Sequence, residues 1–275
     1  MNTNNFIENA ALGKNKWWQY ALSILATATA VVIVNIVTRQ FIPTIKSWVP
    51  DNDFGKNLFT FSLVFLIFGG ALISFIFSAS KLHQRAKFSF ISNQSTFSWK
   101  LYFLGFLLWG SLLFVCCLIT DYDKFETFVT SFDINQFLLL LLLGFLAFGI
   151  QSFFEELVIR GYFLQGLHLR IKNLALLVVI NSLIFGVLHF GYGIGSFLNS
   201  FVFAIAFAVL VIRQNRIEFV SGAHNAHNLL LAIVFIDLSE TVNAKFDWNI
   251  SWAEFGLEIL ALLFLVGIVY KYFKK

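Results

Sequence analysis

Long apolar stretches recur along the 275-residue chain, each about long enough to cross a lipid bilayer. A membrane-spanning helix needs about 20 predominantly apolar residues. Here 59% of the residues are hydrophobic and 12% are charged, whereas soluble domains carry about 25% charged residues. The sequence therefore predicts an all-α, polytopic membrane protein. The eight expected transmembrane helices lie roughly at residues 18–38, 58–78, 101–120, 136–158, 174–190, 194–212, 220–236 and 254–271.

The sequence offers no sign of division into separate domains. It has no linker rich in Pro, Gly or Ser, no low-complexity tract and no clear repeat, so residues 1–275 are expected to form a single transmembrane domain. Cys116 and Cys117 are adjacent within an apolar run, and they predict neither a disulfide framework nor a cysteine-type zinc site. The polar first sixteen residues and the lack of a small-residue cleavage site argue against a cleavable signal peptide.

The distribution of Lys and Arg predicts the orientation in the membrane. Both termini and alternate loops together carry 14 of these residues, and the loops on the other side carry five: Arg39, Lys46, Lys56, Lys124 and Lys245. By the positive-inside rule, both termini are expected in the cytoplasm, as in a multi-pass protein of the plasma or inner membrane. Because the basic residues follow the loops, the net charge of +4 indicates contact with membrane lipids and no nucleic-acid partner.

Two adjacent carboxylates, Glu155 and Glu156, interrupt the fourth apolar stretch. A charged residue in the middle of a bilayer costs about 2.5–3.5 kcal/mol even on insertion-based scales, so such residues are usually paired or functional. Arg160 follows Glu156 by four residues, which is the favourable order for an ion pair within a helix. Glu155 points about 100° away from that pair on a helix. One carboxylate is thus expected to be held by Arg160, and the other is free to act on a proton.

Histidines and an asparagine on later helices complete the intramembrane polar set. His189 lies about as far after the turn near residues 171–173 as Glu155 lies before it, so an antiparallel pair of helices would place both at the same depth. His224 and Asn228 share one helix face, and an imidazole with an amide could bind a water molecule or stabilise an oxyanion. His227 lies slightly off that face and is interpreted as structural or supporting. His224 reaches the same depth only if the fourth and fifth helices project further toward the cytoplasm.

Each of these features has a plain structural explanation when it is taken alone. The Glu156–Arg160 pair could lock a helix bundle, and His189 could be a buried histidine with its hydrogen bonds satisfied. Two glutamates, an arginine, two histidines and an asparagine within the membrane-spanning part of the chain are harder to explain in that way. The whole set therefore favours a functional site.

The order of three motifs on successive helices resembles the CPBP family of intramembrane proteases. These motifs are Glu155-Glu156-x-x-x-Arg160, Phe185-x-x-x-His189 and His224-x-x-x-Asn228. The family includes CAAX prenyl endopeptidases and the bacteriocin-processing or self-immunity proteins of bacteria, also called the Abi family. The resemblance covers roughly residues 135–236, as a catalytic core between the N-terminal scaffold spans of residues 1–130 and the last span at 254–271.

The resemblance implies hydrolysis of a peptide bond by water, without a covalent acyl-enzyme. It implies that Glu155 with His189 activates the water, that His224 with Asn228 stabilises the oxyanion, and that Glu156 with Arg160 orients Glu155. Two mechanisms stay open. A divalent metal ion, zinc by residue type, could be held by Glu155, His189 and His224, or the glutamate could act without a metal. The expected substrate is a peptide or protein in or at the membrane. The length of this chain and its Phe content look bacterial.

Two other functions are compatible with the same residues. A non-proteolytic membrane protein of this fold could act in bacteriocin self-immunity or as a scaffold. A proton-coupled transporter could also place Glu and His in its spans, but such proteins often contain inverted repeats and helices broken by Gly or Pro. No such repeat is evident here.

Overall fold

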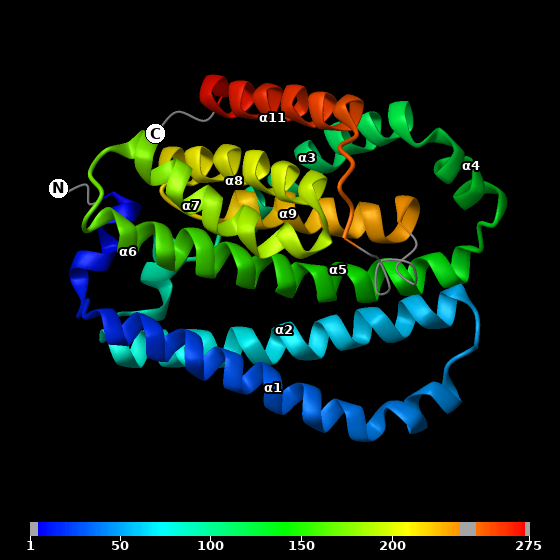
Figure 1. Cartoon of the computed structure of the whole chain (residues 1–275), viewed down its shortest axis with the longest axis horizontal. Coiled ribbons are helices and arrows are strands. Elements are labelled where there is room, and N and C mark those ends of the chain that lie inside the picture. The colour runs from blue at the N-terminus through cyan, green and yellow to red at the C-terminus, as the bar shows by residue number, and fades with distance from the viewer. Residues whose placement is uncertain (1–4, 237–245, 273–275) are drawn as a thin grey trace.

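The computed structural model describes residues 5–236 and 246–272, and within these ranges every regular element is helical (Figure 1). Seven helical runs are long and apolar enough to cross a membrane. They are α1 (Trp17–Trp48), α2 (Asp53–His83), α3 (Trp99–Thr120), α5 (Ile134–Glu156) with its continuation to His168, α7 (Leu174–His189), α8 (Ile194–Gln214) and α11 (Trp252–Tyr272). The expected all-α, multi-pass membrane protein is thereby confirmed.

The expected span at residues 220–236 differs from the other seven. This segment forms α9 (Glu218–Leu230) followed by a π-helical turn, η5 (Leu231–Phe235), and it is not among the seven candidate spans of the described chain. Every residue from Glu218 to Ala226 is buried, and α9 packs against α3 and α5. Because other helices surround α9, its histidines and amides face protein rather than lipid.

Two glycines allow α9 to lie against α3 at backbone contact. A Cβ atom added at Gly105 of α3 would overlap the carbonyl oxygen of Phe219, and one at Gly222 of α9 would overlap the carbonyl oxygen of Tyr102. Small residues at a helix crossing permit this close approach, which is a common packing mode in membrane proteins. The crossing holds the helix that carries His224 in the middle of the bundle.

The helices that carry the other site residues begin at side-chain caps. Asp133 accepts hydrogen bonds from the backbone N–H groups of Asn135 and Gln136 at the start of α5. Asn173 accepts one from the N–H of Leu176 at the start of α7. Asp and Asn are preferred at such positions because the first N–H groups of a helix have no partner within it.

The segment from Phe6 to Leu12 packs into the fold, although the sequence suggested only a polar leading segment. Residues Phe6–Leu12 form a short 3-10 helix, η1, in which Phe6 and Ile7 are buried, and it packs against α6 (Leu164–His168). The N–H of Phe6 donates to Oδ1 of Asn215 at 2.9 Å. Asn215 ends α8 in the left-handed conformation, with a φ angle of 60°. The N-terminal segment therefore contacts the C-terminal end of α8 at one end of the bundle.

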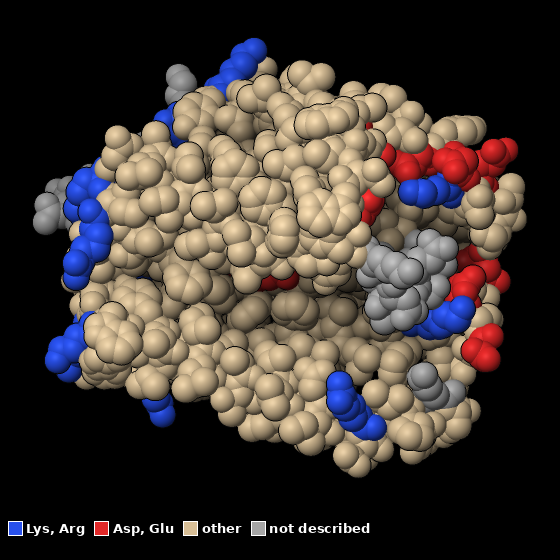
Figure 2. Space-filling view, in the orientation of Figure 1, with Lys and Arg blue, Asp and Glu red and all other residues tan. Residues whose placement is uncertain are grey.

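Charge is distributed unequally between the two ends of the bundle. Lys and Arg gather at the end where α1 begins and α11 ends, and Asp and Glu gather at the opposite end (Figures 1 and 2). Because α1 begins and α11 ends at the same end of the bundle, the chain must run between the two ends an even number of times. The seven candidate spans reach an even number only when α9 is counted with them. Which end faces the cytoplasm stays a prediction from the positive-inside rule, and Lys245, Lys274 and Lys275 lie outside the described residues.

Candidate active site

The buried Glu156–Arg160 pair forms the base of the site. Nη1 of Arg160 donates to Oε1 of Glu156 at 3.1 Å, and both side chains are 0% exposed. The guanidinium also lies over the ring of Phe185, with its central carbon 4.7 Å from the ring centroid. This is the ion pair that the four-residue spacing predicts. Two guanidinium nitrogens, Nε and Nη2, have no hydrogen-bond partner among the described residues, so Glu156 supplies the main compensation of this charge.

Glu156 also fixes the orientation of His224. Its Oε1 lies 2.8 Å from Nδ1 of His224. A carboxylate paired with an arginine only accepts hydrogen bonds, so Nδ1 carries the hydrogen. In the neutral ring, Nε2 then bears the lone pair. The resemblance implied that Glu156 orients Glu155, but in the structure Glu156 instead holds the histidine of another helix.

Glu155 lies on the other side of the same imidazole. Its Oε2 is 3.7 Å from Nε2 of His224, and its side chain is 18% exposed. Its Oε1 accepts a hydrogen bond from Nε2 of Gln151 at 3.1 Å. The two glutamates are therefore separated as expected: one is fully buried and ion-paired, and the other is partly accessible.

His189 lies at the end of α7, and the ring of Phe185 lies between it and His224. Its Nδ1 is 2.9 Å from the carbonyl oxygen of Phe185, and the ring of Phe185 contacts both imidazoles, with centroid distances of 4.5 Å to His189 and 5.9 Å to His224. Among the described residues, Glu155 makes its contacts with His224 and Gln151, and no hydrogen bond or ion pair joins it to His189. The expected Glu155–His189 pair is thus replaced by Glu155–His224.

Asn228 and His227 follow His224 along α9. Nδ2 of Asn228 makes a long contact of 3.5 Å with Oγ of Ser152, which leaves its amide available to a ligand. Nδ1 of His227 accepts from the indole of Trp109 at 3.3 Å, and the two rings stack. This anchored ring fits the structural or supporting role expected for His227.

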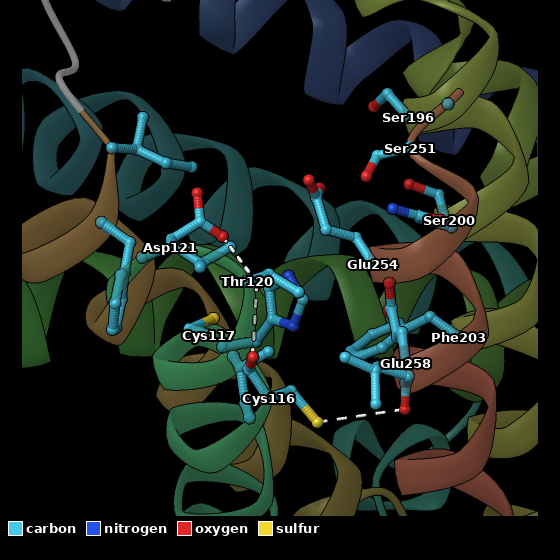
Figure 3. A pocket seen from close by; sticks show the side chains of 18 of the residues that line it. Cys116, Cys117, Thr120, Asp121, Ser196, Ser200, Phe203, Ser251, Glu254 and Glu258 are labelled. Carbon is cyan, nitrogen blue, oxygen red and sulfur yellow. Dashed lines mark hydrogen bonds between the residues drawn. The ribbon is translucent and has the colours of Figure 1, made fainter. Parts of the chain in front are cut away.

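A cavity of about 740 Å³ begins at these side chains. His189, His224, His227 and Asn228 line its inner part, and Asp121, Lys124 and Glu254 line its far part. Figure 3 shows the far part, where residues of α3 and α11 face each other across the space. The cavity gives all four of these α9 and α7 side chains a shared volume in which a substrate could meet them, and Glu155 lies beside its lining through the contact with His224.

Glu155, His189 and His224 are the residues expected to hold a metal ion. In the described part of the chain, no three His, Cys, Asp or Glu side chains are grouped so that they could hold a metal ion. Nδ1 of His224 contacts Glu156 and Nδ1 of His189 contacts a backbone carbonyl, so each ring keeps Nε2 available, as histidines that bind a metal commonly do. The described structure does not group Glu155, His189 and His224 as one ligand set, and zinc binding by them stays a prediction.

Several residues of the site were not apparent from the sequence. Gln151 precedes Glu155 by four residues, a spacing that could have indicated their hydrogen bond. The segment Leu157–Phe163, η3, is π-helical and contains Arg160. Short π-helical turns often occur at functional sites, but no residue pattern marks them. The buried Asn225, which donates to the hydroxyl of Tyr102 at 2.8 Å, depends on the α3–α9 crossing.

The fold and the site together define a multi-pass helical membrane protein with an ionisable cluster inside the bundle. Residues 136–230 match the family described as Type II CAAX prenyl endopeptidase Rce1-like. The resemblance to the CPBP family is thereby confirmed over this segment, which contains every motif residue, and the family supports a CAAX-type intramembrane protease kind of function.

One curated relative and the solved structures add to this comparison. The chain is 24% identical to the uncharacterized protein YyaK of Bacillus subtilis (strain 168), over an alignment that covers 96% of this chain and 94% of the relative. No solved structure matches.

Proposed function

We propose that this protein is an intramembrane endopeptidase in which Glu155 activates a water molecule to hydrolyse a peptide bond. The observation that carries the proposal is the 3.7 Å separation between Oε2 of Glu155 and Nε2 of His224. Both atoms are hydrogen-bond acceptors when His224 is neutral, and one water can donate to both. The oxygen lone pairs of that water are then free to attack a carbonyl carbon. The substrate is a peptide or protein in or at the membrane.

Each side chain has a distinct part in this reaction. Glu155 takes a proton from the water as the carbon–oxygen bond forms, and it returns that proton to the nitrogen of the leaving amine as the carbon–nitrogen bond breaks. Glu156, held by Arg160, keeps Nδ1 of His224 protonated and Nε2 directed at the water. The four-residue spacing of His224 and Asn228 brings the amide of Asn228 to the same cavity, where it donates to the oxyanion.

His189 acts from the opposite wall of the cavity. The carbonyl oxygen of Phe185 fixes its Nδ1 as the protonated nitrogen, so Nε2 can accept a hydrogen bond from the substrate. This role differs from the activation of water that the resemblance implies, because Glu155 is paired with His224.

The Glu155→Gln variant tests the proposal. Purified protein in neutral detergent is screened against quenched fluorescent peptides, and cleavage sites are identified by mass spectrometry. Loss of the general base should lower kcat by at least about 100-fold, with an unchanged melting temperature because Glu155 is partly exposed.

Glu218→Gln is a matched control. Glu218 is a buried glutamate at the start of α9 and lies outside the cavity lining, so its replacement should leave kcat within about threefold. Cleavage by Glu155→Gln at the wild-type rate would refute the assignment. Absence of cleavage by every form, with intact folding, would favour the non-proteolytic alternative.

A further inference from the structure

The cavity leads from the site residues to the acid-rich end of the bundle. Its lining follows one helical run from His224 to Phe235, which is about 16 Å at a rise of 1.5 Å per residue. It reaches the exposed residues Asp247, Asn249 and Glu254. The Glu156–Arg160 pair beside the site is fully buried and does not line the cavity. A substrate segment in this cavity would therefore extend toward the acid-rich end.

The far part of the cavity has an excess of negative charge. Four of its lining residues are acidic, and they are Asp121, Asp247, Glu254 and Glu258. Lys124 is the cation among the described lining residues, and it is already paired with Asp121 at 2.6 Å. Asp247 accepts hydrogen bonds from Asn249. Lys124 also lies within electrostatic range of Glu254, but this one cation does not balance the two remaining carboxylates of the lining as well as Asp121.

Those two carboxylates, Glu254 and Glu258, lie one turn apart on α11 and point into the cavity opposite Cys116 and Cys117 of α3 and Asp121, which follows α3 (Figure 3). Neither makes a hydrogen bond or an ion pair with another described residue. Glu258 lies within an otherwise apolar membrane-spanning helix. An acidic residue at such a position is costly and usually faces a functional cavity, and a cationic group in this cavity would compensate its charge.

The wall between the acidic residues and the histidines can bind a polypeptide backbone. Ser196, Asn199 and Ser200 of α8 line the cavity, and Oδ1 of Asn199 is buried without a hydrogen-bond partner among the described residues. Inside a membrane protein, the amide groups of an extended peptide need such partners. The length of about 16 Å accommodates about five extended residues.

We propose that this cavity binds a substrate segment whose Lys or Arg residues lie about three to five positions from the cleaved bond and contact Glu254 and Glu258. The inference rests on the proposed endopeptidase function, and it adds the substrate class and the direction of entry. The basic residues of the segment remain at the acid-rich end, and the scissile bond reaches His224. The cavity volume of about 740 Å³ lies in the range of about 300–1,000 Å³ that is usual for small-ligand sites, so a short segment enters rather than a folded domain.

Binding to a catalytically inactive protein tests the charge selectivity separately from cleavage. The Glu155→Gln protein in neutral detergent is titrated with fluorescein-labelled pentalysine, and pentaglutamine and pentaglutamate serve as reference probes. Adding Glu254→Gln and Glu258→Gln should weaken pentalysine binding by at least about tenfold and reduce its salt dependence. Pentaglutamine binding should change by less than about twofold.

A second pair of acidic residues provides the matched control. Asp123 and Glu126 are exposed on α4 (Tyr122–Thr130) near the same end, but they do not line the cavity. Asp123→Asn with Glu126→Gln removes the same charge and should leave pentalysine binding within about twofold. Equal weakening by both double variants, or no weakening by Glu254→Gln with Glu258→Gln, would overturn the proposal. Intact binding without any cleavage would refute only the endopeptidase function.

The two cysteines of the chain provide an independent probe, because both line the cavity. A cationic methanethiosulfonate reagent should modify Cys116 at least about tenfold faster than an anionic one, and pentalysine should protect it. The charge preference should disappear in Glu254→Gln with Glu258→Gln, and Cys116→Ser should identify the labelled thiol. Equal rates for the two reagents, or labelling that pentalysine does not slow, would contradict a cation-selective cavity.

Discussion

Replacing Glu156 by Gln should destabilise the whole helix bundle, because it leaves Arg160 as a buried charge without a counter-charge. Both side chains are 0% exposed and their charged atoms are 3.1 Å apart. Removing one partner of such a pair typically costs about 3–5 kcal/mol. The contact with Phe185 remains, but a cation–π interaction contributes only about 0.5–2 kcal/mol. Glutamine keeps the size of the side chain, so loss of packing adds little.

Thermal unfolding of the purified protein in detergent measures this effect. For a chain of this size, about 3–5 kcal/mol corresponds to a melting temperature lowered by roughly 6–20 °C. Glu218→Gln is the comparison, because Glu218 is also 0% exposed but its cation, Arg216, is 3.9 Å away and partly exposed. That change should cost less than about 2 kcal/mol.

A double variant shows how much of the lost stability comes from leaving the charge of Arg160 unpaired. Adding Arg160→Met to Glu156→Gln removes both charges, and replacement of a whole buried ion pair by apolar groups is often neutral or stabilising. The double variant should therefore melt above Glu156→Gln. If Glu156→Gln costs less than about 1 kcal/mol, or if Arg160→Met lowers the melting temperature further, the reasoning about this pair is wrong.

Three further outcomes are expected. Gly222→Ala should cost about 1–3 kcal/mol by forcing α9 away from α3, whereas Gly256→Ala, whose added Cβ meets no neighbour, should be neutral in the same melting assay. Asn228→Ala should lower kcat by about 100- to 1,000-fold without changing the melting temperature, and an unchanged kcat would remove Asn228 from the oxyanion site. Dialysis against a chelator should leave peptide cleavage unchanged, because in the proposed mechanism Glu155 activates the water without a metal ion; loss of activity that zinc restores would contradict this.

The helical architecture could be predicted from the sequence because the apolar runs follow directly from the thickness of a bilayer. The segment around α9 is where that reasoning stops. Glu218, His224 and Asn228 lower its hydropathy, and only the packing of neighbouring helices shows that they are shielded from lipid. The role of Gly105 and Gly222 at the α3–α9 crossing also could not be predicted, because the sequence does not show which helix packs against each glycine.

The polar residues of the site could be selected from the sequence, but their contacts between different helices could not be predicted from it. Spacing within one helix is enough to predict the Glu156–Arg160 pair. The contacts of Glu155 and Glu156 with His224 join α5 to α9. They depend on how each helix is rotated about its own axis, which the sequence does not specify. Depth alone favoured His189 as the partner of Glu155, because depth fixes the position along a helix but not the direction in which a side chain points.

The hydrogen bond between Phe6 and Asn215 affects the order in which the protein assembles during biosynthesis. Its backbone N–H binds the side chain of Asn215, 209 residues later in the chain. A ribosome releases the N-terminal segment first, yet its docking site is complete only after α8 has been made and inserted. The hydrogen bond between Phe6 and Asn215 therefore forms late in assembly, after the earlier contacts of the segment with Ser89, Asn93 and α6 have become possible. A bulky fusion partner placed before Phe6 would act on that late step, after the transmembrane helices have already been inserted.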